Sequence, residues 1–122
     1  MSARILCIED EPGLGEDITL ELEDAGYAVD LATDGAQGLA ALGARAYDLV
    51  LCDVQVPVRS GLDVLAEAAD NPAYGAPPFI MLTAYSDPAL HVRCARAGAR
   101  HLLVKPVDYD GLLALIAREL AR

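Results

Sequence analysis

The chain has 122 residues, which suits one domain of common size, and 54% of them are hydrophobic, which excludes a disordered chain. Its net charge of −10 argues against DNA or RNA as a direct ligand. No apolar run is long enough for a transmembrane helix, and the N-terminus does not have the pattern of a secretory signal. We therefore expect a cytoplasmic protein without membrane contact, formed as a single domain over residues 1–122.

Five short apolar segments alternate with five segments whose apolar residues recur at helical spacing. The predicted strands cover residues 4–8, 27–31, 47–52, 79–82 and 101–104. Pro12 can open the first helix and Gly26 can close it, and Asp34 can cap the second. The third helix is expected around 62–69 and the fourth after a cap at Ser86 or Asp87. The last carries one apolar stripe formed by Leu112, Leu113, Ile116 and Leu120.

The strands are short and show little alternation of polar and apolar residues, which indicates burial on both faces of a parallel sheet. Short connections and right-handed crossovers then favour an α/β fold with a doubly wound open sheet. The last predicted helix runs to the end of the chain, so we expect no output domain after it.

Polar groups stand where the predicted strands end. Glu9 and Asp10 follow the first strand, Asp53 the third, Thr83 the fourth and Lys105 the fifth. Parallel strands bring these positions to one edge of the sheet, where ligands of such folds bind. Three carboxylates at one edge repel each other unless a cation lies among them, and their hard oxygens favour Mg²⁺ over Zn²⁺. A lysine and a hydroxyl beside that cation predict a Mg²⁺-assisted phosphoryl site.

Four segments resemble the receiver domain of two-component response regulators: ILCIEDE, LVLCDVQVPVRSG, FIMLTAY and HLLVKP. They occur in order, each closes a predicted strand, and the resemblance covers nearly the whole chain. It implies a flavodoxin-like sheet of five parallel strands in the order 2-1-3-4-5. It also implies a protein that takes a phosphoryl group from a phosphohistidine of a sensor histidine kinase or a histidine phosphotransfer protein. Such a domain is not a conventional enzyme, although it catalyses its own Mg²⁺-dependent phosphorylation and dephosphorylation.

The resemblance assigns roles to individual residues. Asp53 matches the phosphoacceptor, Thr83 the hydroxyl that contacts the phosphoryl group and moves on activation, and Lys105 the cation that pairs with a phosphoryl oxygen. Pro106 matches a proline after a cis bond that aims Lys105 into the site. The implied metal ligands are Glu9 through water, Asp10, Asp53 and the backbone carbonyl of Gln55. Two further residues, Pro57 and Gly61, are interpreted as structural residues that shape the backbone of the loop after Asp53.

Two positions depart from the family pattern. Glu9 replaces the more usual aspartate, which still permits contact with the metal through water. Leu102 stands where the family usually has Tyr or Phe, a ring that turns inward when the threonine moves. We hypothesise that Tyr85, two residues after Thr83, is the switch aromatic of this chain. The alternative is a tyrosine that rests on the surface.

The basic residues are concentrated near the C-terminus. Residues 1–90 hold 16 of the 19 acidic side chains and three of the nine basic ones. In the family, the fourth helix, fifth strand and fifth helix often form the output face. We expect Arg93, Arg96 and Arg100 on that face, where they would bind a downstream protein or a second copy of the chain; ordinary solvated surface is the alternative.

Other functions stay open on the sequence alone. A sheet of this kind could hold a flavin, although no phosphate-cradling glycine loop follows the first strand. A phosphohydrolase with an aspartyl-phosphate intermediate would need a second acid where Gln55 stands. A degenerate receiver would have lost site residues that this chain retains. The chain could also be a receiver fragment of a hybrid histidine kinase or of a larger response regulator.

Overall fold

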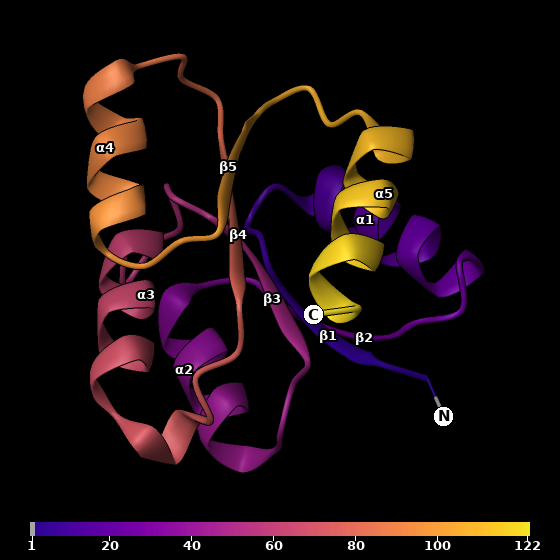
Figure 1. Cartoon of the computed structure of the whole chain (residues 1–122), viewed down its shortest axis with the longest axis horizontal. Helices are drawn as coiled ribbons and strands as arrows, with labels where there is room; N and C mark the ends of the chain where they lie inside the picture. Colours follow the sequence, from indigo (N-terminus) through magenta and orange to yellow (C-terminus); the bar gives the residue numbers. More distant parts are fainter. Residues whose placement is uncertain (1) are drawn as a thin grey trace.

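The structure, a computed structural model, describes residues 2–122 and alternates five strands with five α-helices (Figure 1). The strands are β1 (Arg4–Ile8), β2 (Ala28–Ala32), β3 (Leu49–Asp53), β4 (Phe79–Thr83) and β5 (His101–Val104). The helices are α1 (Pro12–Asp24), α2 (Gly35–Ala44), α3 (Gly61–Asp70), α4 (Pro88–Arg96) and α5 (Tyr109–Leu120), with a short 3₁₀ helix, η1 (Pro72–Tyr74), before β4. Across these described residues, no helix has the length and apolar character needed to cross a bilayer.

All five strands are parallel and lie in the order β2-β1-β3-β4-β5, which confirms the fold class and strand order expected from the sequence. Ile8 pairs with Cys52, and Thr83 pairs with Val104. The carboxyl ends of β1, β3, β4 and β5 therefore lie at one edge of the sheet. The predicted boundaries were right to within about two residues; Asp53 is the last residue of β3 rather than the first after it.

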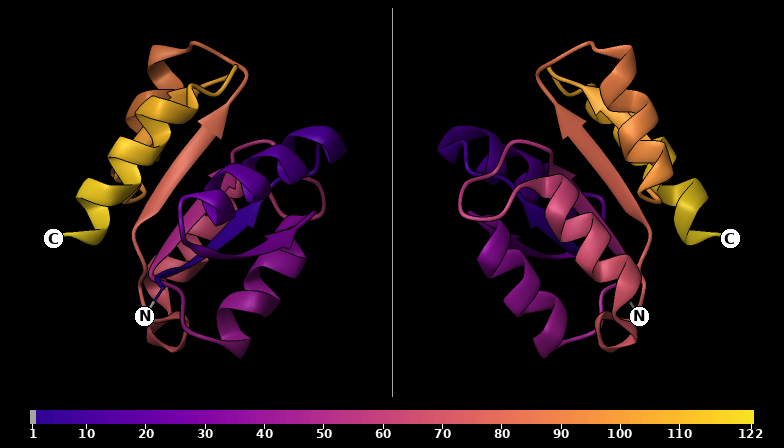
Figure 2. Two further views of the ribbon diagram at one scale, coloured as in Figure 1. Left: turned by 90° about the vertical axis from the view of Figure 1, so that its right-hand side faces the viewer. Right: turned by 90° about the vertical axis from the view of Figure 1, so that its left-hand side faces the viewer.

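Two apolar layers cover the sheet. Ile5 and Cys7 of β1 point to the face covered by α1 and α5, and Leu6 and Ile8 point to the face covered by α2, α3 and α4 (Figure 1). The central strands β1, β3 and β4 are almost wholly buried, and β2 and β5 at the edges are less so. In the side views of Figure 2, α4 and α5 flank β5 at one edge of the sheet. Burial on both faces explains why these strands carry almost no alternation.

Aspartate caps fix the start of two helices. Asp34 Oδ1 accepts a hydrogen bond from the Gln37 amide at 2.7 Å, as predicted for α2. At α4 the cap is Asp87, whose Oδ1 accepts a hydrogen bond from the Ala89 amide at 3.0 Å. Of the two caps predicted for this helix, Asp87 is therefore the correct one and Ser86 is not. Each such cap is worth about 0.5–2 kcal/mol.

The start of α3 lies against the end of β3. A Cβ atom at Gly61 would stand 2.2 Å from the backbone oxygen of Asp53, so a side chain at this position would force the helix away from the strand. The absence of a side chain at Gly61 lets the chain turn back tightly beside Asp53.

Candidate functional site

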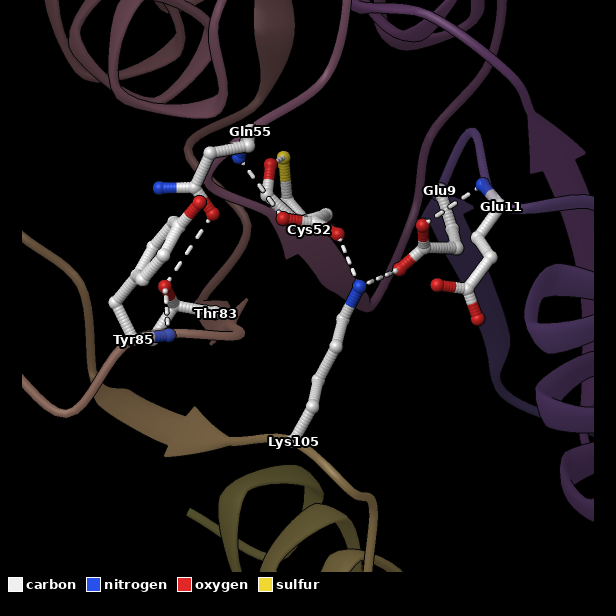
Figure 3. A network of polar contacts seen from close by, with 8 residues as sticks. Glu9, Glu11, Cys52, Gln55, Thr83, Tyr85 and Lys105 are labelled. Atoms are coloured by element: carbon white, nitrogen blue, oxygen red, sulfur yellow. Dashed lines mark hydrogen bonds and ion pairs between the residues drawn. The ribbon is translucent and has the colours of Figure 1, made fainter.

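The four strand ends bring together the groups that the sequence singled out. Glu9 follows β1, Asp53 ends β3, Thr83 ends β4, and Lys105 follows β5. Glu9, Asp53 and Thr83 are buried, and the Lys105 side chain is 16% exposed. The Lys105 ammonium lies between the carboxylates of Glu9 and Asp53. Figure 3 shows it reaching toward Glu9. Residues up to 96 positions apart in the chain therefore form one cluster, because parallel strands end at a common edge.

Lys105 is held by both buried acids. Its Nζ lies 2.9 Å from Glu9 Oε1 and hydrogen-bonds to Asp53 Oδ2. Burial alone would lower the pKa of Lys105, but the contacts with Asp53 and Glu9 outweigh burial and raise it. The lysine therefore stays charged in the site. The peptide bond before Pro106 is cis, as the sequence predicted.

Glu9 carries a charge that its surroundings do not fully offset. Burial raises its pKa, the neighbouring charge of Asp53 raises it further, and the Glu11 amide and the Lys105 ammonium offset only part of this effect. Glu9 Oε2 accepts from the Glu11 amide at 3.0 Å. Glu9 Oε1 is buried, and its close polar contact is the Lys105 ammonium at 2.9 Å. That ammonium is shared with Asp53, so it does not neutralise both carboxylates.

Three carboxylates meet at this point. Glu9, Asp10 and Asp53 each place one oxygen within 4.8 Å of the others. Lys105 supplies a single positive charge against three negative ones, so the cluster has an excess of negative charge. Three carboxylate donors with excess negative charge fit a hard divalent cation such as Mg²⁺. Asp10 is exposed, which leaves the cluster open to solvent on that side.

Asp53 is engaged through both carboxylate oxygens. Oδ1 accepts a hydrogen bond from the backbone amide of Gln55 at 2.8 Å, and Oδ2 contacts Lys105. The carboxylate is 3% exposed, so these contacts fix its direction at the end of β3. Gln55 thus lies directly beside the Asp53 carboxylate.

Thr83 has its hydroxyl fully engaged on the opposite side of the site. Its Oγ1 donates to Gln55 Oε1 at 3.3 Å and accepts from the Tyr85 amide at 3.1 Å. Tyr85 is 60% exposed, and Figure 3 shows its ring beside the Gln55 side chain. The sequence singled out Thr83 and Tyr85, but it did not reveal that the Gln55 side chain accepts a hydrogen bond from the Thr83 hydroxyl.

Leu102 lies apart from this network. It is half-buried and packs against the apolar layer on the α2–α4 face of the sheet. Val104, the last residue of β5, is 37% exposed. The place of the usual family aromatic is thus taken by an aliphatic core contact.

The loop after Asp53 contains a residue with a strained backbone conformation that was not predicted from the sequence. Val58 adopts φ +69°, which is uncommon for a β-branched residue, and its side chain is 75% exposed. The Arg59 amide bonds to the Pro57 carbonyl at 2.9 Å, which closes a three-residue turn around Val58. The Gly35 amide also reaches this carbonyl, so Pro57 ties the loop to the start of α2.

A second buried carboxylate lies away from the carboxyl ends of the strands, beside the start of β5. Glu119 of α5 accepts from His101 Nε2 at 2.8 Å and from Arg100 Nε at 3.2 Å, with Arg122 Nε at 3.7 Å. Arg100, expected on an output face, is therefore paired with Glu119. A cavity of about 710 Å³ adjoins this cluster and is lined by Phe79 and the ends of α3, α4 and α5. It contains none of the strand-end groups.

Comparisons with known proteins agree with this geometry. The family model of the response regulator receiver domain matches residues 5–117. The transcriptional regulatory protein DltR of Streptococcus agalactiae is 43% identical over 113 residues, which are 93% of this chain and 50% of DltR. A putative response regulator from Chloroflexus aurantiacus has a TM-score of 0.94 at 29% identity, with both chains fully covered.

A second similar structure contains a metal ion. The receiver domain of sensor histidine kinase PA1611 from Pseudomonas aeruginosa, with a magnesium ion coordinated in its active site cleft, has a TM-score of 0.91 at 29% identity, again with both chains fully covered. The chain belongs to the response regulator receiver domain family and is a receiver module of two-component signalling. It spans about half the length of the DltR relatives that it matches.

Proposed function

We propose that this chain accepts a phosphoryl group on Asp53 from a phosphohistidine of a sensor histidine kinase or histidine phosphotransfer protein, with Mg²⁺ as cofactor. The observation that carries the proposal is the convergence of Glu9, Asp10 and Asp53 within 4.8 Å, with Lys105 between two of them. Lysine, hydroxyl and acid cluster together match what phosphoryl transfer requires, namely positioning and charge neutralisation. We place this function in the cytoplasm, without membrane or direct nucleic-acid contact.

The residues that would hold Mg²⁺ are Asp10 and Asp53 directly, Glu9 through water, and the Gln55 backbone carbonyl. When bound there, the cation would neutralise charge on the acceptor and on the phosphoryl oxygens. The convergence of three carboxylates and their excess of negative charge over the single ammonium of Lys105 support this assignment.

The chain's own groups account for the transfer step. A carboxylate oxygen of Asp53 attacks phosphorus, the bond from phosphorus to the imidazole nitrogen of the donor breaks, and the donor leaves as a histidine. Lys105, already beside Asp53, pairs with a phosphoryl oxygen, and the Thr83 hydroxyl donates to another. Attack of water on the same phosphorus would return free Asp53 and phosphate. The domain would thus catalyse its own phosphorylation and dephosphorylation without being a conventional enzyme.

Incubation with acetyl phosphate and Mg²⁺, followed by intact-protein mass spectrometry, tests the proposal. The wild type should gain one phosphoryl group, and Asp53→Ala should gain none. Asp63→Ala removes an exposed acid of α3 and should behave as the wild type. A wild type that stays unmodified, or a modified Asp53→Ala that NMR shows to be folded, would refute the acceptor role.

The signal would leave through the α4–β5–α5 face and reach a downstream protein or a second copy of the chain. Arg93 and Arg96 are exposed on α4 beside Val92, which is 49% exposed. A surface that combines cations with an apolar side chain supports contact with an acidic partner.

Reversing both charges (Arg93→Glu with Arg96→Glu) should weaken beryllofluoride-dependent self-association in sedimentation experiments, or binding of an acidic partner. Unchanged association with intact phosphorylation would count against this face.

Tyr85 is our proposed switch aromatic, because Leu102 has no ring and Tyr85 is bonded through its amide to Thr83. Its ring should change position when a phosphoryl mimic binds. Ring chemical shifts recorded with and without beryllofluoride test this, and identical shifts would remove the idea.

A further inference from the structure

We propose that the Gln55 side chain is a positioning residue that holds the Thr83 hydroxyl in the resting state and must release it when Asp53 is phosphorylated. This inference rests on the proposed function, since it concerns the threonine that would contact the phosphoryl group. It assigns a role to the side chain of Gln55, in addition to that of its backbone.

Gln55 is in contact with both groups. Its backbone amide donates to Asp53 Oδ1 at 2.8 Å, and its side-chain oxygen accepts from Thr83 Oγ1 at 3.3 Å. The acceptor and the hydroxyl, which lie 30 positions apart in the chain, are therefore linked through a single residue. Figure 3 shows this chain of contacts from Tyr85 through Thr83 to Gln55.

The Thr83 hydroxyl has one proton to donate. In the resting state that proton is directed at Gln55, while the Tyr85 amide donates to the same oxygen at 3.1 Å. A phosphoryl oxygen can take the proton only after the bond to Gln55 is broken. The two acceptors therefore compete for one hydrogen atom.

The competition is confined to a side chain because the Thr83 backbone is fixed. Thr83 is fully buried at the end of β4, and its carbonyl accepts from the Lys105 amide at 2.7 Å. Gln55 is an exposed residue and its bond to Thr83 is long and only partly buried, so we expect a weak hydrogen bond. A hydrogen bond of this class shifts an equilibrium by roughly two- to tenfold, which is the size of effect we expect.

The experiment measures the apparent affinity for beryllofluoride in saturating Mg²⁺ by NMR, with Gln55→Ala and Gln55→Met beside the wild type. Methionine keeps the length of the side chain and removes the oxygen. Both variants should bind beryllofluoride about two- to tenfold more tightly. In the metal-free protein, the couplings that report the Thr83 side-chain rotamer should change from one conformer to an average of several.

Two controls separate the hydrogen bond from other effects. Gln37→Ala removes another glutamine oxygen that accepts from a threonine hydroxyl, that of Thr33 at 3.1 Å, and should change neither readout. In a Thr83→Val background, which lacks the hydroxyl, Gln55→Ala should no longer tighten binding.

Unchanged or weaker binding in Gln55→Ala, a gain seen with alanine but not methionine, or a gain that persists with Thr83→Val would each overturn the inference. If the wild type itself fails to bind beryllofluoride, the proposed acceptor function fails instead. The two failures are therefore distinguishable.

Discussion

Two polar clusters, each built around a buried glutamate, lie near opposite ends of β5, and they differ in charge balance. At the carboxyl end, Glu9, Asp10 and Asp53 share the one positive charge of Lys105. At the other end, Glu119 is surrounded by Arg100, His101 and Arg122.

The pKa values of the two glutamates shift in opposite directions. Burial and the charge of Asp53 raise the pKa of Glu9. Burial also acts to raise the pKa of Glu119, but the hydrogen bond from His101 and the charge of Arg100 outweigh it and lower that pKa. An acid cluster with too few cations is suited to take up a metal, whereas an acid enclosed by cations stabilises the fold. The difference shows that burial of a carboxylate does not by itself mark a functional site.

The largest expected effect comes from removing one acid of the first cluster. Asp10→Asn should lower Mg²⁺ affinity by at least about tenfold, because it removes the charge of a proposed ligand on the open side of the cluster. Titration calorimetry or NMR measures this directly. Asp24→Asn, at the exposed end of α1, is the matched control and should bind as the wild type does. Equal affinities of the two variants would remove Asp10 from the metal site.

Removing the acid of the second cluster should affect stability and leave metal binding alone. Glu119→Gln should lower the free energy of unfolding by about 1–2 kcal/mol, because Arg100 and Arg122 lose their buried counter-charge. Denaturant unfolding measures the loss, with Glu23→Gln on the exposed part of α1 as control. A changed Mg²⁺ affinity in Glu119→Gln would contradict the conclusion that only the first cluster takes up the metal.

The pH dependence of that loss has a definite sign. The folded-state pKa of Glu119 is lowered, so its contribution to stability is present above the ordinary glutamate pKa and disappears as pH falls through the folded-state value. The stability difference between wild type and Glu119→Gln should therefore shrink in acid. A difference that stays constant down to the lowest pH at which both proteins fold would contradict the assigned pairing.

The smallest effect concerns competition inside the first cluster. Lys105 contacts Glu9 and Asp53, which the metal would also use, so Lys105→Met should bind Mg²⁺ about fivefold more tightly. Arg118→Met removes one positive charge from the exposed side of α5 and controls for net charge. Weaker Mg²⁺ binding in Lys105→Met would show that the lysine supports the cluster instead of competing for it.

The sequence was sufficient for the fold and for the place of the site, since Glu9, Asp53, Thr83 and Lys105 each stand at the end of an apolar run. Topology then brings such ends together. The sequence was not sufficient to predict the contacts within the site. Whether Lys105 contacts Glu9 as well as Asp53 depends on side-chain rotamers and on distances of a few ångströms. The spacing of residues in the sequence does not determine either of these.

The buried role of Glu119 was not predicted, although the helical spacing of the sequence contained a signal for it. Glu119 lies three residues after Ile116 and seven after Leu112, on the buried stripe of α5. A charged residue on such a stripe needs a partner, but the partner here is His101, 18 positions earlier on another element. The pairing of α5 with the start of β5 had to be known before the two could be matched. The strained turn at Val58 had no such signal, because valine does not favour positive φ.

The most direct test of the metal and acceptor assignment is a crystal structure grown with Mn²⁺ and beryllofluoride, using the anomalous signal of manganese to locate the ion. We expect the ion among Asp10, Asp53 and the Gln55 carbonyl, with beryllium bound to an Asp53 carboxylate oxygen. Lys105 and Thr83 should then each contact a fluoride. An ion found elsewhere, or beryllofluoride absent from Asp53 in a folded protein, would contradict the account.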